Sequence, residues 1–68
     1  MKDTQSWISE IDFQVENLKL NNRHAYYGFS LDMTKETAYS IVSYFENQNC
    51  QVEVSMCPRR QWDVIITW

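Results

Sequence analysis

The sequence contains very few of the residues that usually mark a catalytic, metal-binding or nucleotide-binding protein. Its 68 residues include one glycine, one proline, one histidine and two cysteines. A chain with a single glycine has no glycine-rich nucleotide-binding motif. The two cysteines, Cys50 and Cys57, match no zinc-binding spacing, and only one histidine could assist them. We therefore expect neither an enzyme nor a protein with a metal or another cofactor.

Long apolar runs and basic residues are also scarce. No run approaches the ~18 apolar residues of a membrane span, and no signal-peptide pattern follows the N-terminus. We accordingly expect a cytoplasmic protein with reduced cysteines and no membrane partner. Six Lys and Arg residues against nine Asp and Glu residues give a net charge of -3. That deficit argues against non-specific nucleic-acid binding, which requires a basic surface to neutralise phosphates.

One stretch, from Thr34 to Gln48, clearly predicts a helix. Thr34 is suited to the N-cap position, and Glu36 lies in the first turn, where the helix dipole favours a negative charge. The apolar residues then follow helical spacing: Ala38, Ile41, Val42 and Phe45. A helix this short is marginal alone, so we expect its apolar stripe to pack on a sheet.

Three other segments alternate apolar and polar residues with the period of a β-strand. They are Ala25–Met33, Gln51–Met56 and Trp62–Trp68. In the first of them, the side chains expected to face the helix are Ala25, Tyr27, Phe29, Leu31 and Met33. Tyr26 is then expected on the exposed face. Gly28, in mid-strand, indicates a β-bulge or the close approach of another backbone.

The segment from Ser6 to Leu20 fits two patterns. Ile11, Phe13 and Val15 alternate with polar residues, as in a strand with one buried face. A helical stripe also fits, through Trp7, Ile11, Val15 and Leu18. The strand is favoured, while the helix remains the alternative, and Asn21-Asn22 predicts a turn before the next strand.

The fold prediction is a single α+β domain over residues 1–68, with a frayed tail at residues 1–5. Its order is ββαββ, in which one helix packs on one face of a four-stranded antiparallel or mixed sheet. The sequence leaves the order of the strands in the sheet open. At this length we also expect a homodimer, since a small core gains stability from association.

In the predicted fold, the sheet face away from the helix collects acidic residues and no basic ones. Like charges on neighbouring strands cost stability, so a face of one sign suits a basic partner. The alternative is a face that is merely solvated. The predicted partner-binding residues are Glu10, Asp12, Glu16, Tyr26, Asp32, Glu53 and Asp63.

Function is therefore predicted to be non-catalytic protein binding. The chain would act as an inhibitor or adaptor on a basic site of a larger protein, which could itself bind nucleic acid. Its size and acidity are of the type found in small inhibitors made by phages and other mobile elements. The alternative is a small nucleic-acid-associated regulator, which would use the turn at Arg59, Arg60 and Trp62.

Overall fold

The first element of the fold is a helix where the sequence favoured a strand. In the computed structural model, which describes residues 2–68, Thr4–Leu20 form an α-helix, α1. Ile11 and Val15 are buried, whereas Phe13 between them has 68% of its surface exposed. Burial therefore follows the helical stripe and not the alternation.

The length of this segment gives the physical reason. Its 17 residues contain no glycine or proline, whereas strands usually have about 3–10 residues. A strand interpretation needs a turn inside the segment, and the sequence offers none there. The tail expected over residues 1–5 is helical from Thr4 onward.

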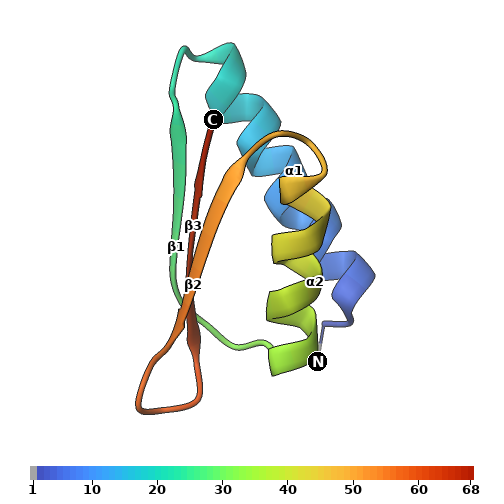
Figure 1. Cartoon of the computed structure of the whole chain (residues 1–68), viewed down its shortest axis with the longest axis vertical. Helices are drawn as coiled ribbons and strands as arrows, with labels where there is room; N and C mark the ends of the chain where they lie inside the picture. The colour runs from blue at the N-terminus through green and yellow to red at the C-terminus, as the bar shows by residue number, and fades with distance from the viewer. Residues whose placement is uncertain (1) are drawn as a thin grey trace.

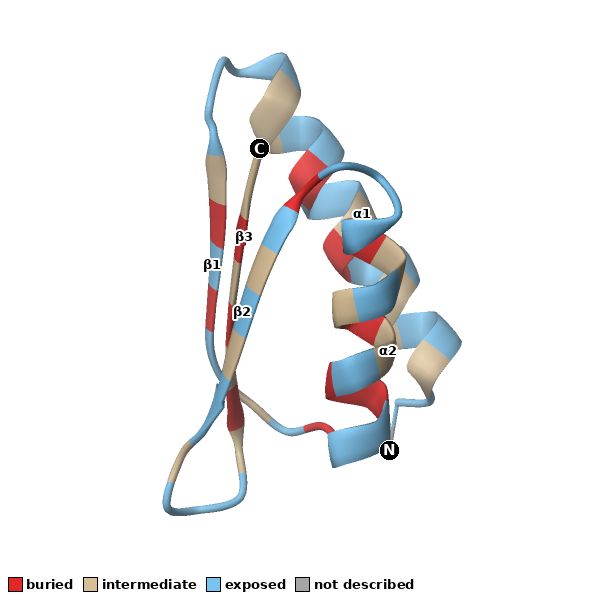
Figure 2. Ribbon diagram, in the orientation of Figure 1, coloured by how far each residue is buried: buried red, intermediate tan, exposed pale blue. Residues whose placement is uncertain are grey.

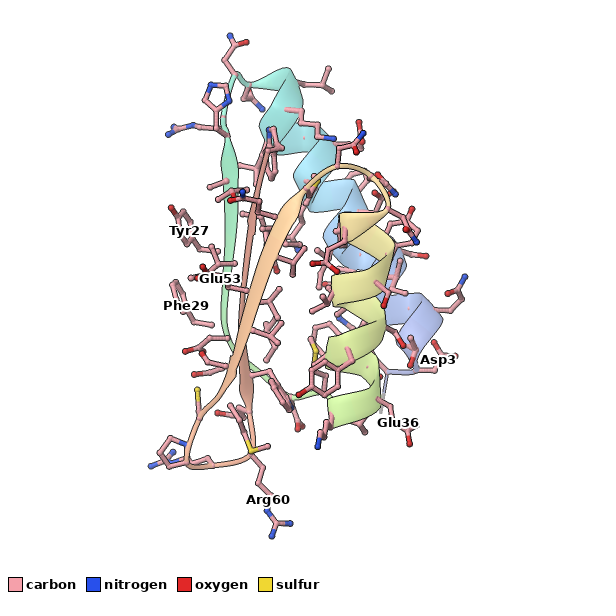
Figure 3. All side chains as sticks on the ribbon, viewed as in Figure 1. Asp3, Tyr27, Phe29, Glu36, Glu53 and Arg60 are labelled. Atoms are coloured by element: carbon pink, nitrogen blue, oxygen red, sulfur yellow. The ribbon has the colours of Figure 1, made fainter. Side chains whose placement is uncertain are left out.

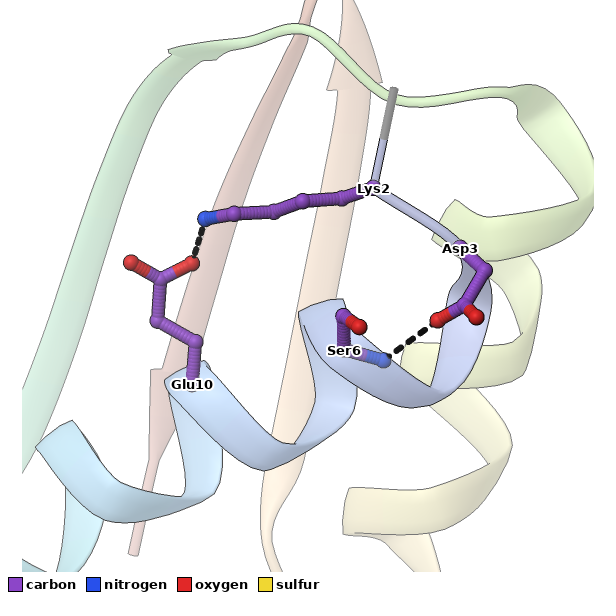
Figure 4. Close-up of polar contacts among 4 residues, drawn as sticks. All are labelled: Lys2, Asp3, Ser6 and Glu10. Atoms are coloured by element: carbon purple, nitrogen blue, oxygen red, sulfur yellow. Dashed lines mark hydrogen bonds and ion pairs between the residues drawn. The ribbon is translucent and has the colours of Figure 1, made fainter.

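Polar side chains define both ends of α1. Asp3 is the N-cap, and its Oδ1 accepts a hydrogen bond from the Ser6 amide at 2.8 Å (Figure 4). This hydrogen bond holds the pKa of the Asp3 carboxyl below its usual value. Lys2 and Glu10 form an ion pair beside the cap. At the other end, Asn22 adopts a left-handed φ of 60°, which asparagine tolerates, so the chain turns where a turn was predicted.

The remaining elements follow the predicted order. β1 (Ala25–Leu31) leads to α2 (Lys35–Glu46), and β2 (Gln51–Met56) and β3 (Trp62–Thr67) form the closing hairpin. β3 lies in the middle of the sheet, antiparallel to both neighbours. The ββαββ prediction is therefore wrong. Residues 2–68 fold as αβαββ, with two helices on one face of a three-stranded antiparallel sheet in the order β1-β3-β2 (Figure 1).

The core fills the space between the helices and the sheet, where the buried segments face one another (Figure 2). Thr34 caps α2 as predicted, with its hydroxyl accepting a hydrogen bond from the Thr37 amide at 3.2 Å. Of the predicted stripe of α2, Ala38, Ile41 and Phe45 are buried, whereas Val42 is half-buried. Burial in β3 alternates as expected for a strand with one buried face. The principal core residues are Ile11, Val15, Ala38, Ile41, Phe45, Trp62, Val64 and Ile66.

The face of β1 that packs against the helices is the opposite of the one that the sequence alternation predicted. Tyr26 is buried, with 6% of its surface exposed, and Gly28 beside it is buried too. Tyr27 and Phe29 are 60% and 62% exposed. The predictions that Tyr26 is exposed and that Tyr27 and Phe29 face the helix are therefore wrong.

A β-bulge explains this reversal. The pairing of β1 with β3 shifts register between Gly28 and Leu31, and Ser30 adopts a φ of 55°. The Ser30 amide donates a hydrogen bond to Asp63 Oδ1 at 2.9 Å. One extra residue reverses the alternation of a strand, so Leu31 and Met33 lie on the helix side as predicted although the residues before the bulge do not.

Gly28 lies directly against the side chain of Tyr26. A Cβ atom at this position would lie 2.7 Å from the Tyr26 hydroxyl and 2.9 Å from Leu31 Cδ1. We expect Gly28→Ala to lower the free energy of unfolding by about 1–3 kcal/mol, because the ring and the leucine must move. Urea unfolding measures the change. Ser55→Ala, at an exposed position of β2, is the control and should alter stability by less than about 0.5 kcal/mol. Equal stability of the two variants would contradict this packing.

Candidate functional site

The sheet face opposite the helices is not covered by any part of residues 2–68, and Tyr27, Phe29 and Glu53 point away from the helices there (Figure 3). Strand register arranges its side chains in three rows, each crossing β1, β3 and β2. The first row is Ala25, Thr67 and Gln51. The second is Tyr27, Ile65 and Glu53. In the third, Asp63 pairs with Ser55, and Phe29 lies in the β1 bulge, between the pair of Gly28 with Val64 and the pair of Leu31 with Trp62. We call the nine residues of these three rows the open face.

The aromatic side chains of the open face all come from β1. The rings of Tyr27 and Phe29 are nearly parallel, with 12° between their planes and 6.3 Å between their centroids. Ile65 lies beside them in the middle of the sheet and is half-buried. Exposed aromatic residues next to an aliphatic one are typical of interaction surfaces, because their burial removes a large apolar area from water.

The charged side chains of the open face are Glu53 and Asp63, and none of its nine residues is basic. Asp63 is held firmly: its Oδ1 accepts hydrogen bonds from the Ser30 amide and, at 3.3 Å, from Cys57 Sγ. This carboxylate therefore connects the β1 bulge to the β2–β3 hairpin. Glu53 projects from β2 toward solvent.

The seven residues predicted to bind a partner do not share one surface. Only Glu53 and Asp63 lie on the open face. Tyr26 is in the core, and Asp32 follows β1 in the connection to α2. The remaining three are on α1, namely Glu10, Asp12 and Glu16. The expectation that six acids gather on one sheet face is therefore wrong, because three of them belong to a helix.

Two of the three predicted acids on α1 differ from those of the open face in having a lysine nearby. Glu10 pairs with Lys2, and Glu16 Oε1 lies 3.8 Å from Lys19 Nζ. Sequence reasoning missed Tyr27 and Phe29 as surface residues. The consecutive aromatics at positions 26 and 27 could have signalled the ambiguity, since they place one ring on each face of the strand.

In the turn proposed as an alternative nucleic-acid contact, the aromatic residue is buried while the two arginines are exposed. Arg59 and Arg60 are exposed in the β2–β3 turn, and Arg60 points away from the molecule (Figure 3). Trp62 is only 5% exposed and packs edge-to-face against Tyr39 of α2, with 6.2 Å between the ring centroids. The fold therefore places Trp62 where it cannot stack on a nucleic-acid base.

The rest of the described chain offers less defined chemistry. A shallow apolar hollow of about 270 Å³ lies between the start of α2 and the β2–β3 turn, with Met33, Met56 and Trp62 among its lining residues. Within residues 2–68, no three His, Cys, Asp or Glu side chains are placed to hold a metal ion. Neither α1 nor α2 combines the length and apolar character that crossing a membrane requires.

The open face is thus the surface whose side chains suggest a function most directly. No protein-family model, curated protein or solved structure matches this chain. Function is accordingly inferred from the residues of the open face and their chemistry.

The contact between Cys57 and Asp63 can be tested through the reactivity of the thiol. The hydrogen bond to Asp63, together with partial burial and the nearby negative charge, raises the pKa of the Cys57 thiol. Since the thiolate is the nucleophile, Cys57 should react with iodoacetamide only at raised pH. Asp63→Asn keeps an acceptor for the Ser30 amide but removes the charge, so alkylation should begin at lower pH.

Mass spectrometry of native protein alkylated between pH 7 and pH 10 measures this effect. Cys50 is buried and serves as the internal control, which should stay unmodified while the fold is intact. The same pH profile for Cys57 in both proteins would show that Asp63 does not act on the thiol.

Proposed function

We propose that this chain is a non-catalytic binding module, an inhibitor or adaptor that docks its open face on a basic site of a larger protein. The observation that supports this most is the exposure of Tyr27 and Phe29 on a sheet face with two acids and no base. An aromatic cluster provides apolar area for affinity, and the carboxylates provide orientation and faster encounter.

Charge favours a basic partner over a second copy of the chain. Two open faces packed together would bring Glu53 and Asp63 of both copies into one desolvated layer, without a basic side chain from either face. Desolvating like charges in this way is costly. A basic surface instead neutralises the same carboxylates.

One edge of the sheet, β1, also favours docking through the face over pairing with another strand. The bulge at Ser30 interrupts β1, and bulges of this kind hinder the pairing of an edge strand with another chain. Asp63 holds that bulge through its hydrogen bond to the Ser30 amide. The same interaction therefore weakens one edge for pairing and presents Phe29 on the open face.

Replacement of the aromatic pair tests the proposal. We expect tagged wild-type protein to retain a partner from an extract of the source cells, and Tyr27→Ser/Phe29→Ser to lose it. Removal of aromatic anchors commonly costs about 2 kcal/mol or more, so affinity for the purified partner should fall by at least tenfold. Phe13→Ser is the matched control, because Phe13 is equally exposed but lies on α1.

Retention of the same partner by the double serine variant would contradict docking through the open face. Circular dichroism and thermal unfolding of each variant ensure that the comparison is made between folded proteins. Loss of the partner by Phe13→Ser alone would place the binding surface on α1 instead.

Charge reversal on the same face tests the predicted nature of the partner. We expect Glu53→Lys to slow association with the purified partner and to reduce the dependence of affinity on salt, because a rim charge acts mainly on the on-rate. Association kinetics at two ionic strengths measure both effects. Faster association of the lysine variant would show that the partner surface is acidic.

A further inference from the structure

The two rings of the aromatic pair on the open face lie close together and nearly parallel. The centroids of Tyr27 and Phe29 are 6.3 Å apart. A ring attracts a cation that lies over its face within ~6 Å of the centroid, and the separation of the two centroids is short enough for one cation to lie within that distance of both. Both rings are more than half exposed, so a side chain from outside can reach this position.

Three other aromatic rings of the chain each have a lysine of the same chain nearby. Lys2 Nζ lies 4.4 Å from the centroid of a Trp7 ring, Lys19 Nζ lies 5.7 Å from Trp68, and Lys35 Nζ lies 5.8 Å from Tyr39. These are all the lysines in the sequence. Within residues 2–68, no cation lies over Tyr27 or Phe29, so the pair on the open face is available to a cation from a partner.

Carboxylates lie next to this pair. Asp63 is opposite the bulge that contains Phe29, on the adjacent strand. Glu53 is in the row of Tyr27, on the far side of Ile65. With about 4.8 Å between strands, a group resting on the rings has a carboxylate one strand away and a second one about 10 Å away.

This combination favours a guanidinium over an ammonium group. A guanidinium is planar and weakly hydrated, so it can stack on a ring while its N–H edge pairs with a carboxylate. An ammonium is a compact, strongly hydrated charge and loses more hydration on the same surface. We propose that the open face binds an arginine side chain of the partner, whose guanidinium stacks on Tyr27 and Phe29 and pairs with Asp63 or Glu53. This inference rests on the proposed function and specifies the chemistry of the partner.

Titration with two peptides of equal charge tests the inference. Hexa-arginine and hexa-lysine, both with blocked ends, are added to ¹⁵N-labelled protein at low salt, and amide shifts are followed by NMR. We expect hexa-arginine to bind about tenfold more tightly, because two rings contribute to stacking. Its shifts should map to β1 and β3, around Tyr27, Phe29 and Asp63.

Two variants make the test specific. Tyr27→Leu/Phe29→Leu keeps apolar bulk but removes the rings, and the tenfold preference for arginine should disappear. Glu53 is exposed on β2, so Glu53→Gln should keep the fold and weaken hexa-arginine binding severalfold, since one carboxylate is lost. The dispersion of the amide spectrum shows whether each variant is folded.

Equal binding of the two peptides would overturn the inference. So would shifts confined to α1, where Glu10, Asp12 and Glu16 could attract any oligocation by charge alone. If the partner is lost by the double serine variant while the peptides show no preference, the arginine inference fails and the proposed function stands. If arginine is preferred on the open face but the partner is retained by that variant, the proposed function fails instead.

Discussion

The Ser30 amide donates a hydrogen bond to Asp63 Oδ1, and the orientation of β1 depends on the bulge that this contact holds. Before the bulge the strand buries Tyr26 and Gly28, and after it the half-buried Leu31 and the buried Met33, which follows the strand, lie on the helix side. Without the extra residue, either the residues before the bulge or those after it would have to face away from the helices. The bulge lets both sets of residues face the helices, and it requires a left-handed backbone at Ser30.

The fold leaves the open face uncovered because both helices pack on the same side. α1 and α2 contact each other above the sheet and bury Ile11, Val15, Ile41 and Phe45 with the inner face of β3. An antiparallel sheet tolerates one uncovered face, but a purely solvated face normally carries polar side chains. Tyr27 and Phe29, which are 60% and 62% exposed, depart from that pattern.

The acids of α1 and the acids of the open face have different surroundings. On α1, Glu10 and Glu16 have lysines of the same chain beside them, which is typical of a solvated helix surface. On the open face, Glu53 and Asp63 lie among uncharged residues and face solvent or the hairpin. The net charge of the whole chain therefore does not describe how its charges are distributed, since the open face has two acids and no basic side chain.

The sequence by itself determined α2 with its Thr34 cap, the strands β2 and β3, and the inward residues Trp62, Val64 and Ile66, because each depends on a local and unambiguous period. Only the tertiary structure decided the rest. Ile11 and Val15 fit a strand and a helix equally well in spacing, and their burial against α2 and the sheet selects the helix. The side of β1 was likewise undetermined, because both of its faces carry a tyrosine and the bulge that selects one depends on Asp63, which is 33 residues away from Ser30 in the sequence. The sequence could therefore identify two acids of the candidate site, Glu53 and Asp63, while the aromatic pair beside them required the fold.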